Sequence, residues 1–325
     1  MRIGVVLSIA LFVGSANADP GWPKGEVLVP KKIFGGGGRD RIVMESNPRL
    51  YVYPDFDPKA DLILVVGMDG WGGRSENFID TMRLGLKAKG LTRRLVLAAI
   101  QDVKTRGPRY QGQGDKRHAN VWRLDRQGFE VMSHFVDRLS KEFGHLRVYF
   151  VGYSSGSVAA PFVAAFAAET GNRRYTVEGS ISLGVGSPIK PDRLKRNNLR
   201  ALFIVVPKRE RGDPRTKRDD QYKRKTAETL ADKAVGAGAT VYLRHIGSAK
   251  RHIDWHWGLM SQCRYFKGKR TDNGRGYYPH YWLPNPDSWG LMAVFIQGGK
   301  PPEGLENPRT KCGIPPNPNN LGDPG

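Results

Sequence analysis

The sequence has few cysteines and, beyond its first residues, no long apolar run. Only 2 cysteines occur among 325 residues, which excludes a small fold held together by a framework of disulfides. No apolar run after the N-terminal one is long enough for a transmembrane helix. No internal repeat is visible either. Because apolar residues still make up 39% of the composition, we predict a globular protein with a substantial hydrophobic core.

Acidic residues are scarce relative to basic ones. The chain contains 52 lysines and arginines against 31 aspartates and glutamates, which gives a net charge of +21. Such a charge says much about a protein's surroundings and little about its fold. We expect electrostatic association with anionic envelope surfaces or polymers, with general solubility as the plainer interpretation. No nucleic-acid recognition module is visible, so no specific nucleic acid is expected as a partner.

The N-terminal residues have the pattern of a targeting segment. Arg2 precedes the apolar run from Ile3 to Val13, which is too short to span a bilayer, and Ala16-Asn17-Ala18 follows. A positive start, a short apolar run and a small-x-small site are typical of a secretory signal peptide. We therefore expect cleavage near Ala18 and a secreted or periplasmic mature protein.

The two cysteines, Cys263 and Cys312, both lie in the last fifth of the chain. An even, sparse count in an exported protein indicates one disulfide. This bond would close a loop of about 49 residues. In the chain-entropy description, it would stabilise the protein by ~4 kcal/mol. Two free buried thiols are the alternative.

Most of the chain shows buried strands that alternate with helices. The strands are continuous apolar runs, and the helices have apolar residues at helical spacing. This alternation predicts an α/β fold with a mostly parallel central sheet and helices on both faces. The expected strands cover residues 62–66, 95–100, 146–151, 177–183, 202–206 and 241–243, and the expected helices cover 75–89, 124–143, 157–168 and 216–236.

The alternation defines one domain over residues 61–300. Residues 19–60 are expected to form an N-terminal extension with edge strands, in which 42–44 pairs with 50–53. The glycines at 35–38 are not followed by Gly-Lys-Ser/Thr, so residues 19–40 indicate a flexible connection and not a phosphate loop. Residues 301–325 are expected to form a Pro/Gly-rich C-terminal tail.

The pentapeptide Gly152-Tyr153-Ser154-Ser155-Gly156 has the form Gly-x-Ser-x-Gly. It lies between an expected strand and an expected helix. A strand, a sharp turn flanked by glycines and a helix form the setting in which this motif exposes a nucleophilic serine at the edge of a sheet. The glycines are needed because the strand and the helix pass very close to each other. We therefore predict that Ser154 is a nucleophile.

A nucleophilic serine requires a base, and the base requires an acid that orients it. Two histidines follow the last expected strand, of which His252 is the first choice and His256 the alternative. Their i, i+4 spacing could also suit a metal, but no third ligand accompanies them. The acid is expected after the strand at 202–206. Asp213 is the preferred acid there, with Glu210, Asp219 and Asp220 as competitors.

The developing oxyanion requires backbone donors. The glycine-rich turn around Trp71 follows the strand at 62–66. An N–H group of this turn and the N–H of Ser155 could both donate to the oxyanion of a tetrahedral intermediate. A strand-to-helix turn that contacts no ligand is the alternative.

These motifs resemble those of the α/β-hydrolase superfamily, and more loosely those of its secreted esterases and depolymerase-like members. The resemblance covers about residues 60–300. It implies Ser154 as the nucleophile, Asp213 as the acid and His252 as the base. One departure is Asp69-Gly70 in the oxyanion turn, where many members have His-Gly. Asp69 is therefore expected either to orient this turn or to perturb the site.

The resemblance implies an exported serine hydrolase, and more narrowly a carboxylic ester hydrolase that forms an acyl-enzyme on Ser154. A peptidase or amidase with the same triad is one alternative. A catalytically inactive hydrolase fold that binds anionic envelope polymers is another. The expected substrate is a small-molecule or polymer ester. Basic residues around Asp213 could attract an anionic substrate, or they form a solvated charged face. No metal or organic cofactor is implied.

Overall fold

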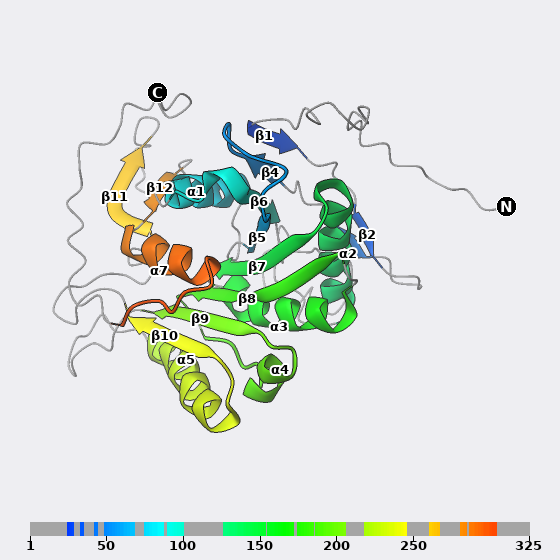
Figure 1. The fold of residues 1–325 in the computed structure, drawn as a ribbon. Coiled ribbons are helices and arrows are strands. Elements are labelled where there is room, and N and C mark those ends of the chain that lie inside the picture. The colour runs from blue at the N-terminus through cyan, green and yellow to red at the C-terminus, as the bar shows by residue number, and fades with distance from the viewer. Residues whose placement is uncertain are drawn as a thin grey trace.

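The centre of the molecule is an eight-stranded sheet (Figure 1). The structure, a computed structural model, describes residues 25–28, 33–35, 42–44, 49–68, 75–87, 90–100, 126–153, 155–171, 174–184, 186–205, 218–245, 260–266, 280–284 and 286–303. Across the sheet, the strands follow the order β1 (Gly25–Leu28), β4 (Arg49–Val52), β6 (Leu95–Ile100), β5 (Ile63–Met68), β7 (Leu146–Tyr153), β8 (Tyr175–Leu183), β9 (Arg200–Val205) and β10 (Val241–His245).

Most neighbouring strands of this sheet are parallel. The parallel pairs run from β6 through β5, β7, β8 and β9 to β10. Strand β4 is antiparallel to β6, and β1 is antiparallel to β4. Strand β6 lies between β4 and β5 although it follows β5 in the chain. A mostly parallel sheet was predicted from the sequence, and this prediction is confirmed.

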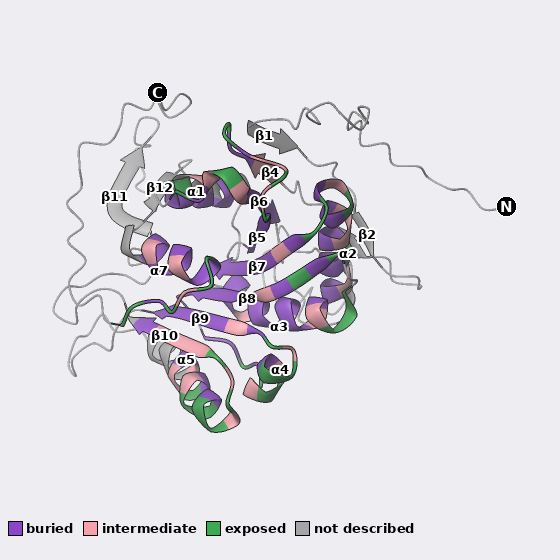
Figure 2. Cartoon of the chain, in the orientation of Figure 1, coloured by how far each residue is buried: buried purple, intermediate pink, exposed green. Residues whose placement is uncertain are grey.

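Helices cover both faces of the sheet because alternate residues of a strand point to opposite sides. In β5, Leu64 and Val66 belong to one hydrophobic cluster, and Ile63 and Val65 belong to the other. Strands β5 and β6 are buried at every residue, and β7 and β8 are buried over most of their length (Figure 2). The first cluster includes residues of α2 (Arg126–Phe143), α3 (Ser155–Thr170), α4 (Pro191–Arg196) and α5 (Arg218–Ala237), and the second includes residues of α1 (Ser75–Lys87) and α7 (Pro286–Ile296).

Short elements lie outside this sheet. Strand β2 (Ile33–Gly35) pairs with β3 (Ile42–Met44), and β11 (Met260–Phe266) pairs with β12 (His280–Pro284), both in antiparallel fashion. A single 3₁₀ turn, η1 (Thr92–Arg94), leads into β6.

Two expectations for the N-terminal extension are wrong. Residues 42–44 pair with β2 and not with residues 50–53, and β4 lies inside the sheet between β1 and β6. Residues 19–40 contain β1 and β2 and are not only a flexible connection. Strands of three or four residues are too short to show a clear alternation, and their pairing depends on tertiary neighbours.

Two arginines attach the segment after α7 to β9 and β10. The Nε and Nη2 of Arg244 donate to the carbonyl oxygen of Pro301 at 3.0 and 2.6 Å. Arg200 donates to the carbonyls of Phe295, at 3.3 Å, and Gly299. Arg244 is buried, and this burial lowers the pKa of its guanidinium. Because a buried charge needs hydrogen-bond partners, the Pro301 carbonyl helps to stabilise β10.

Ion pairs join the last turn of α3 to α4. Arg193 donates to both carboxylate oxygens of Glu169, with Nε at 3.0 Å and Nη2 at 2.7 Å. Arg196 donates to the same carboxylate at 3.0 Å. These hydrogen bonds, that of Arg193 above all, hold the pKa of the Glu169 carboxyl at about 2, below its ordinary value of 4.5.

The variant Glu169→Gln is expected to lower the free energy of unfolding at neutral pH by about 1 kcal/mol, because surface ion pairs are partly screened. The pKa of Glu169 is depressed in the folded state. Its stabilisation is therefore complete above pH 4.5 and is lost as the pH falls toward about 2. Urea unfolding of the wild type and the variant across this pH range measures the difference.

The control for this experiment is Glu130→Gln on α2. Glu130 accepts from Arg126 at 2.8 Å in an i, i+4 pair. Its loss is expected to cost at most ~0.5 kcal/mol. A Glu169→Gln effect that is no larger than that of the control, or that stays constant down to pH 2, contradicts the prediction.

Candidate active site

The strands that precede the predicted catalytic residues end at the same edge of the sheet. The carboxyl ends of parallel strands meet at the same edge of a sheet. Met68 of β5 lies opposite Gly152 of β7, and Val205 of β9 lies opposite His245 of β10. In the sequence, Trp71 follows β5, Ser154 follows β7, Asp213 follows β9, and His252 and His256 follow β10. These five residues lie outside the described ranges, so their mutual geometry stays a prediction.

Strand β7 and helix α3 come very close at the turn of residues 152–156, here called the elbow. A Cβ atom on Gly152 would lie 2.0 Å from the carbonyl oxygen of Gly156 and 2.6 Å from the nitrogen of Ser157. Both are backbone atoms, so no side-chain movement relieves the overlap. Strand β7 ends at Tyr153 and α3 begins at Ser155. The predicted need for glycine at position 152 is confirmed.

Helix α3 begins directly after Ser154. The first N–H groups of a helix have no acceptor within the helix and carry a partial positive charge. Ser155 is the first residue of α3, so its N–H belongs to this set. The residue after the nucleophile is the one whose N–H can stabilise an oxyanion. Of the two predicted oxyanion donors, Ser155 thus lies in a described helix, whereas Trp71 does not.

Buried serine hydroxyls form hydrogen bonds that link the first turn of α3 to β7 and β8. The Oγ of Ser157 lies 3.0 Å from the carbonyl oxygen of Gly152 and 2.5 Å from that of Leu183. Since a hydroxyl carries one proton, it donates fully to only one of them at a time. The Oγ of Ser182 donates to the carbonyl of Ser157 at 2.8 Å. Both serines are fully buried, at 0% exposure, so water does not compete for these bonds.

The residue that follows β8 forms a hydrogen bond with β9, the strand that precedes the predicted acid. The N–H of Gly184 donates to the carbonyl of Ile204 at 2.8 Å. Gly184 has a φ of +92°, a left-handed conformation that favours glycine. Ile204 precedes Val205, the last residue of β9. Strand β8 therefore connects the elbow on one side with the start of the Asp213 loop on the other.

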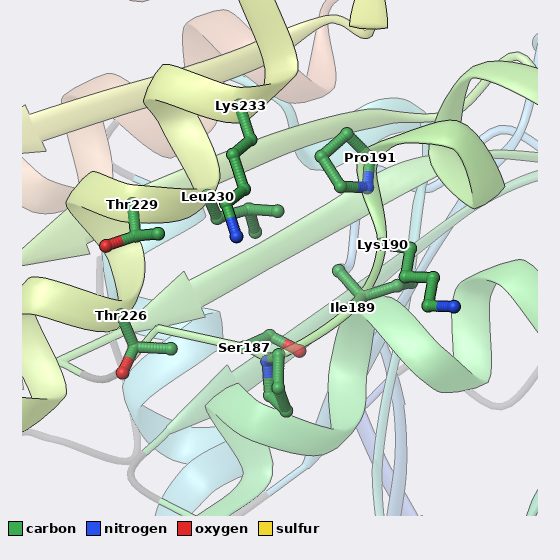
Figure 3. Close-up of a pocket in the computed structure, with 9 residues that line it drawn as sticks. Ser187, Ile189, Lys190, Pro191, Thr226, Thr229, Leu230 and Lys233 are labelled. Atoms are coloured by element: carbon green, nitrogen blue, oxygen red, sulfur yellow. The ribbon is translucent and has the colours of Figure 1, made fainter.

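A cavity of about 500 Å³ lies between α5 and the segment 187–191 (Figure 3). Leu230 contributes apolar surface, and Lys233 extends from α5 toward the space between α5 and this segment (Figure 3). At the border of this cavity, the Oγ of Ser187 donates to the carbonyl of Val158 in the first turn of α3 at 2.9 Å. The volume lies in the range of small-molecule sites. The cavity could therefore receive an apolar group close to α3.

The roles of Ser157, Ser182 and Ser187 were not predicted from the sequence. Ser157 directly follows the Gly-x-Ser-x-Gly motif. Ser182 lies between the apolar residues Ile181 and Leu183 at the end of β8, where a buried polar side chain usually has a hydrogen-bond partner. The sequence contains this signal, but it does not identify the partner of the hydroxyl.

The predicted disulfide stays a prediction. Cys263 lies in β11, and Cys312 lies outside the described residues.

Over the described ranges, no group of three or more His, Cys, Asp or Glu residues is placed to hold a metal ion. In the same part of the chain, no helix is both long and apolar enough to cross a membrane.

The sheet and the elbow together define the fold class. A mostly parallel sheet covered on both faces, with a strand–Gly-x-Ser-x-Gly–helix turn at its carboxyl edge, is the α/β-hydrolase fold. No family model matches the chain, and no curated protein matches it in sequence.

Several solved structures are similar to this chain. A thermostable esterase from Pseudomonas putida is 14% identical over 67% of this chain and 72% of that one, with a TM-score of 0.39. A feruloyl esterase module from Clostridium thermocellum, complexed with sinapinate, is 10% identical over 68% and 80%, with a TM-score of 0.43. A carboxyl esterase from Tuber melanosporum is 10% identical over 71% and 78%, with a TM-score of 0.42.

Proposed function

We propose that the protein is an exported serine hydrolase that cleaves carboxylic esters through an acyl-enzyme on Ser154. The geometry of the elbow is the observation that supports this most. Gly152 packs against the backbone of α3, and Ser154 is the single residue between the end of β7 and the N-terminus of α3. A serine held in such a turn presents its hydroxyl at the edge of the sheet, next to unpaired helix N–H groups.

The proposed reaction has two halves. Ser154 Oγ attacks the ester carbonyl while His252 takes its proton, and Asp213 orients the imidazole. The N–H groups of Ser155 and Trp71 stabilise the oxyanion. When the tetrahedral intermediate collapses, the alcohol leaves with the proton from His252. A water molecule, deprotonated by His252, then attacks the acyl-enzyme, which releases the acid and restores the Ser154 hydroxyl.

The proposed substrate is a small-molecule or polymer ester, with an anionic one favoured by charge. The net charge of +21 supports association with anionic envelope surfaces, and the segment of residues 1–18 supports export to the periplasm or the medium. Lys190 and Lys233 are described basic residues that line the cavity beside α5. An anionic group that reached this cavity would gain from these charges.

Labelling with a fluorophosphonate tests the nucleophile. We expect the wild type to form a covalent adduct that mass spectrometry locates on Ser154, because such probes phosphonylate an activated serine. The variant Ser155→Ala is the matched control, since it removes the neighbouring hydroxyl and leaves the backbone N–H in place. Labelling is expected to persist in Ser155→Ala and to be absent from Ser154→Ala. An unlabelled wild type, or equal labelling of Ser154→Ala, contradicts the proposed function.

The class of bond is tested by a panel of substrates. Nitrophenyl esters, neutral and carboxylate-bearing, are compared with aminoacyl anilides on the same enzyme preparation. We expect the esters to be hydrolysed with the higher kcat/KM, because an alcohol leaving group needs less complete protonation than an amine. Faster hydrolysis of the anilides assigns the site to a peptidase or amidase. If the protein binds anionic polymers but hydrolyses no substrate in the panel, it is a catalytically inactive hydrolase fold.

A further inference from the structure

Helix α3 contains a proline in its second turn, Pro161. In a regular α-helix, each N–H donates to the carbonyl four residues earlier. Proline has no N–H, so the carbonyl of Ser157 lacks the donor that residue 161 would otherwise supply. Ser157 is fully buried, at 0% exposure, and water cannot easily replace that donor. A buried carbonyl left without a donor costs free energy comparable to a lost hydrogen bond.

A side chain from a different element supplies the missing donor. The Oγ of Ser182, on β8, donates to the carbonyl of Ser157 at 2.8 Å. Ser182 is itself fully buried, so the bond is sheltered from solvent. The hydroxyl of Ser157 in turn contacts the carbonyls of Gly152 and Leu183. The first turn of α3, the end of β7 and the end of β8 are thereby linked through two serines.

We propose that Ser182 is a positioning residue for the nucleophile Ser154. Its hydroxyl takes the place of the N–H that Pro161 lacks and holds the first turn of α3 against β8. Ser154 stands directly before that turn, so the position of its Oγ depends on this bond. The inference rests on the proposed function, because it assigns Ser182 a role in the reaction of Ser154. A misplacement of a reacting group by about 1 Å can cost on the order of 10²-fold in rate.

The first test compares two serines on the same strand. Ser180 and Ser182 are both buried, at 1% and 0% exposure, and residues two apart in a strand point to the same side. The Oγ of Ser180 has no hydrogen-bond partner among the described residues. Ser180→Ala is therefore a matched control, with the same chemical change and no bond lost.

We expect Ser182→Ala to lower kcat for a nitrophenyl ester about tenfold, with KM unchanged, because the change displaces the nucleophile and leaves substrate contacts intact. The second-order rate constant of fluorophosphonate labelling is expected to fall by the same factor. Ser180→Ala is expected to retain the wild-type values of both. A thermal unfolding curve of each variant verifies that the protein is folded at the assay temperature.

The second test is a rescue. Pro161→Ala gives residue 161 an N–H that can donate to the Ser157 carbonyl within the helix. In the double variant Pro161→Ala/Ser182→Ala, kcat and the labelling rate are expected to return to within about threefold of the wild type. A general loss of packing at position 182 would not be repaired by a change in α3. If Ser182→Ala alone gives no folded protein, recovery of folded, labelled protein in the double variant supports the proposal.

Three results overturn the inference. They are wild-type kcat in Ser182→Ala, an equal loss of kcat in Ser180→Ala, and a double variant no better than Ser182→Ala. Each of them leaves the proposed function standing, provided that the wild type is labelled on Ser154. Failure of the wild type to be labelled is a separate outcome, which overturns the proposed function and the positioning role with it.

Discussion

His252→Ala is expected to lower kcat for ester hydrolysis by about 10⁴-fold or more, because Ser154 then keeps its proton and remains a weak nucleophile. Binding of the substrate does not require the imidazole, so KM is expected to change little. The measurement is steady-state hydrolysis of a nitrophenyl ester. The residual rate of the His252→Ala variant is compared with the uncatalysed rate in the same buffer.

His256→Ala is the matched control for the base. The two histidines lie four residues apart on the same segment after β10, and His256 is expected to contribute little to kcat. A loss in His256→Ala that exceeds the loss in His252→Ala assigns the base to His256 and contradicts our choice. Asp213→Asn is expected to lower kcat less than His252→Ala, because the base is still present but less well oriented.

Gly152→Ala is expected to lower the free energy of unfolding by about 3 kcal/mol or more, which is large for the addition of one methyl group. The added Cβ would meet the carbonyl oxygen of Gly156 at 2.0 Å, and both strand β7 and helix α3 are packed in the core around it. The overlap is relieved only by separating the strand from the helix. Urea unfolding measures the loss, and the separated elbow is expected to lose fluorophosphonate labelling as well.

Gly236→Ala makes the same chemical change in an open position. Gly236 lies in α5, and a Cβ there would meet nothing within 4 Å. Alanine favours a helix over glycine, so this variant is expected to gain about 0.5 kcal/mol of stability. If Gly152→Ala unfolds at the urea midpoint of the wild type, the close approach at the elbow is not a constraint on the sequence.

The central part of the fold was predictable because its strands are buried on both faces. A run such as Leu95 to Ile100 is apolar throughout, and the structure buries every residue of it. The strand–turn–helix at Ser154 was predictable for a different reason, since its glycines mark a close backbone approach that few other sequences allow.

Pairing and hydrogen-bond partners were less predictable. Nothing local distinguishes residues 42–44, which pair outside the main sheet, from residues 49–52, which join it. Ser180 and Ser182 look alike in the sequence, yet only Ser182 faces a carbonyl that lacks a helical donor. That difference arises from Pro161 in another element, and it becomes visible only when α3 and β8 are packed together.

The attachment of Arg244 to Pro301 has a consequence for the order in which the chain folds. The guanidinium and the carbonyl that accepts its hydrogen bonds are 57 positions apart in the chain. A chain that is synthesised or translocated from its N-terminus presents β10 well before Pro301 emerges. Until then, burial of Arg244 would leave the charge without that acceptor, which disfavours the folded state of this side of the sheet. In a protein that we propose to be exported, Arg244 thus disfavours the closing of β10 onto the sheet until Pro301 has crossed the membrane.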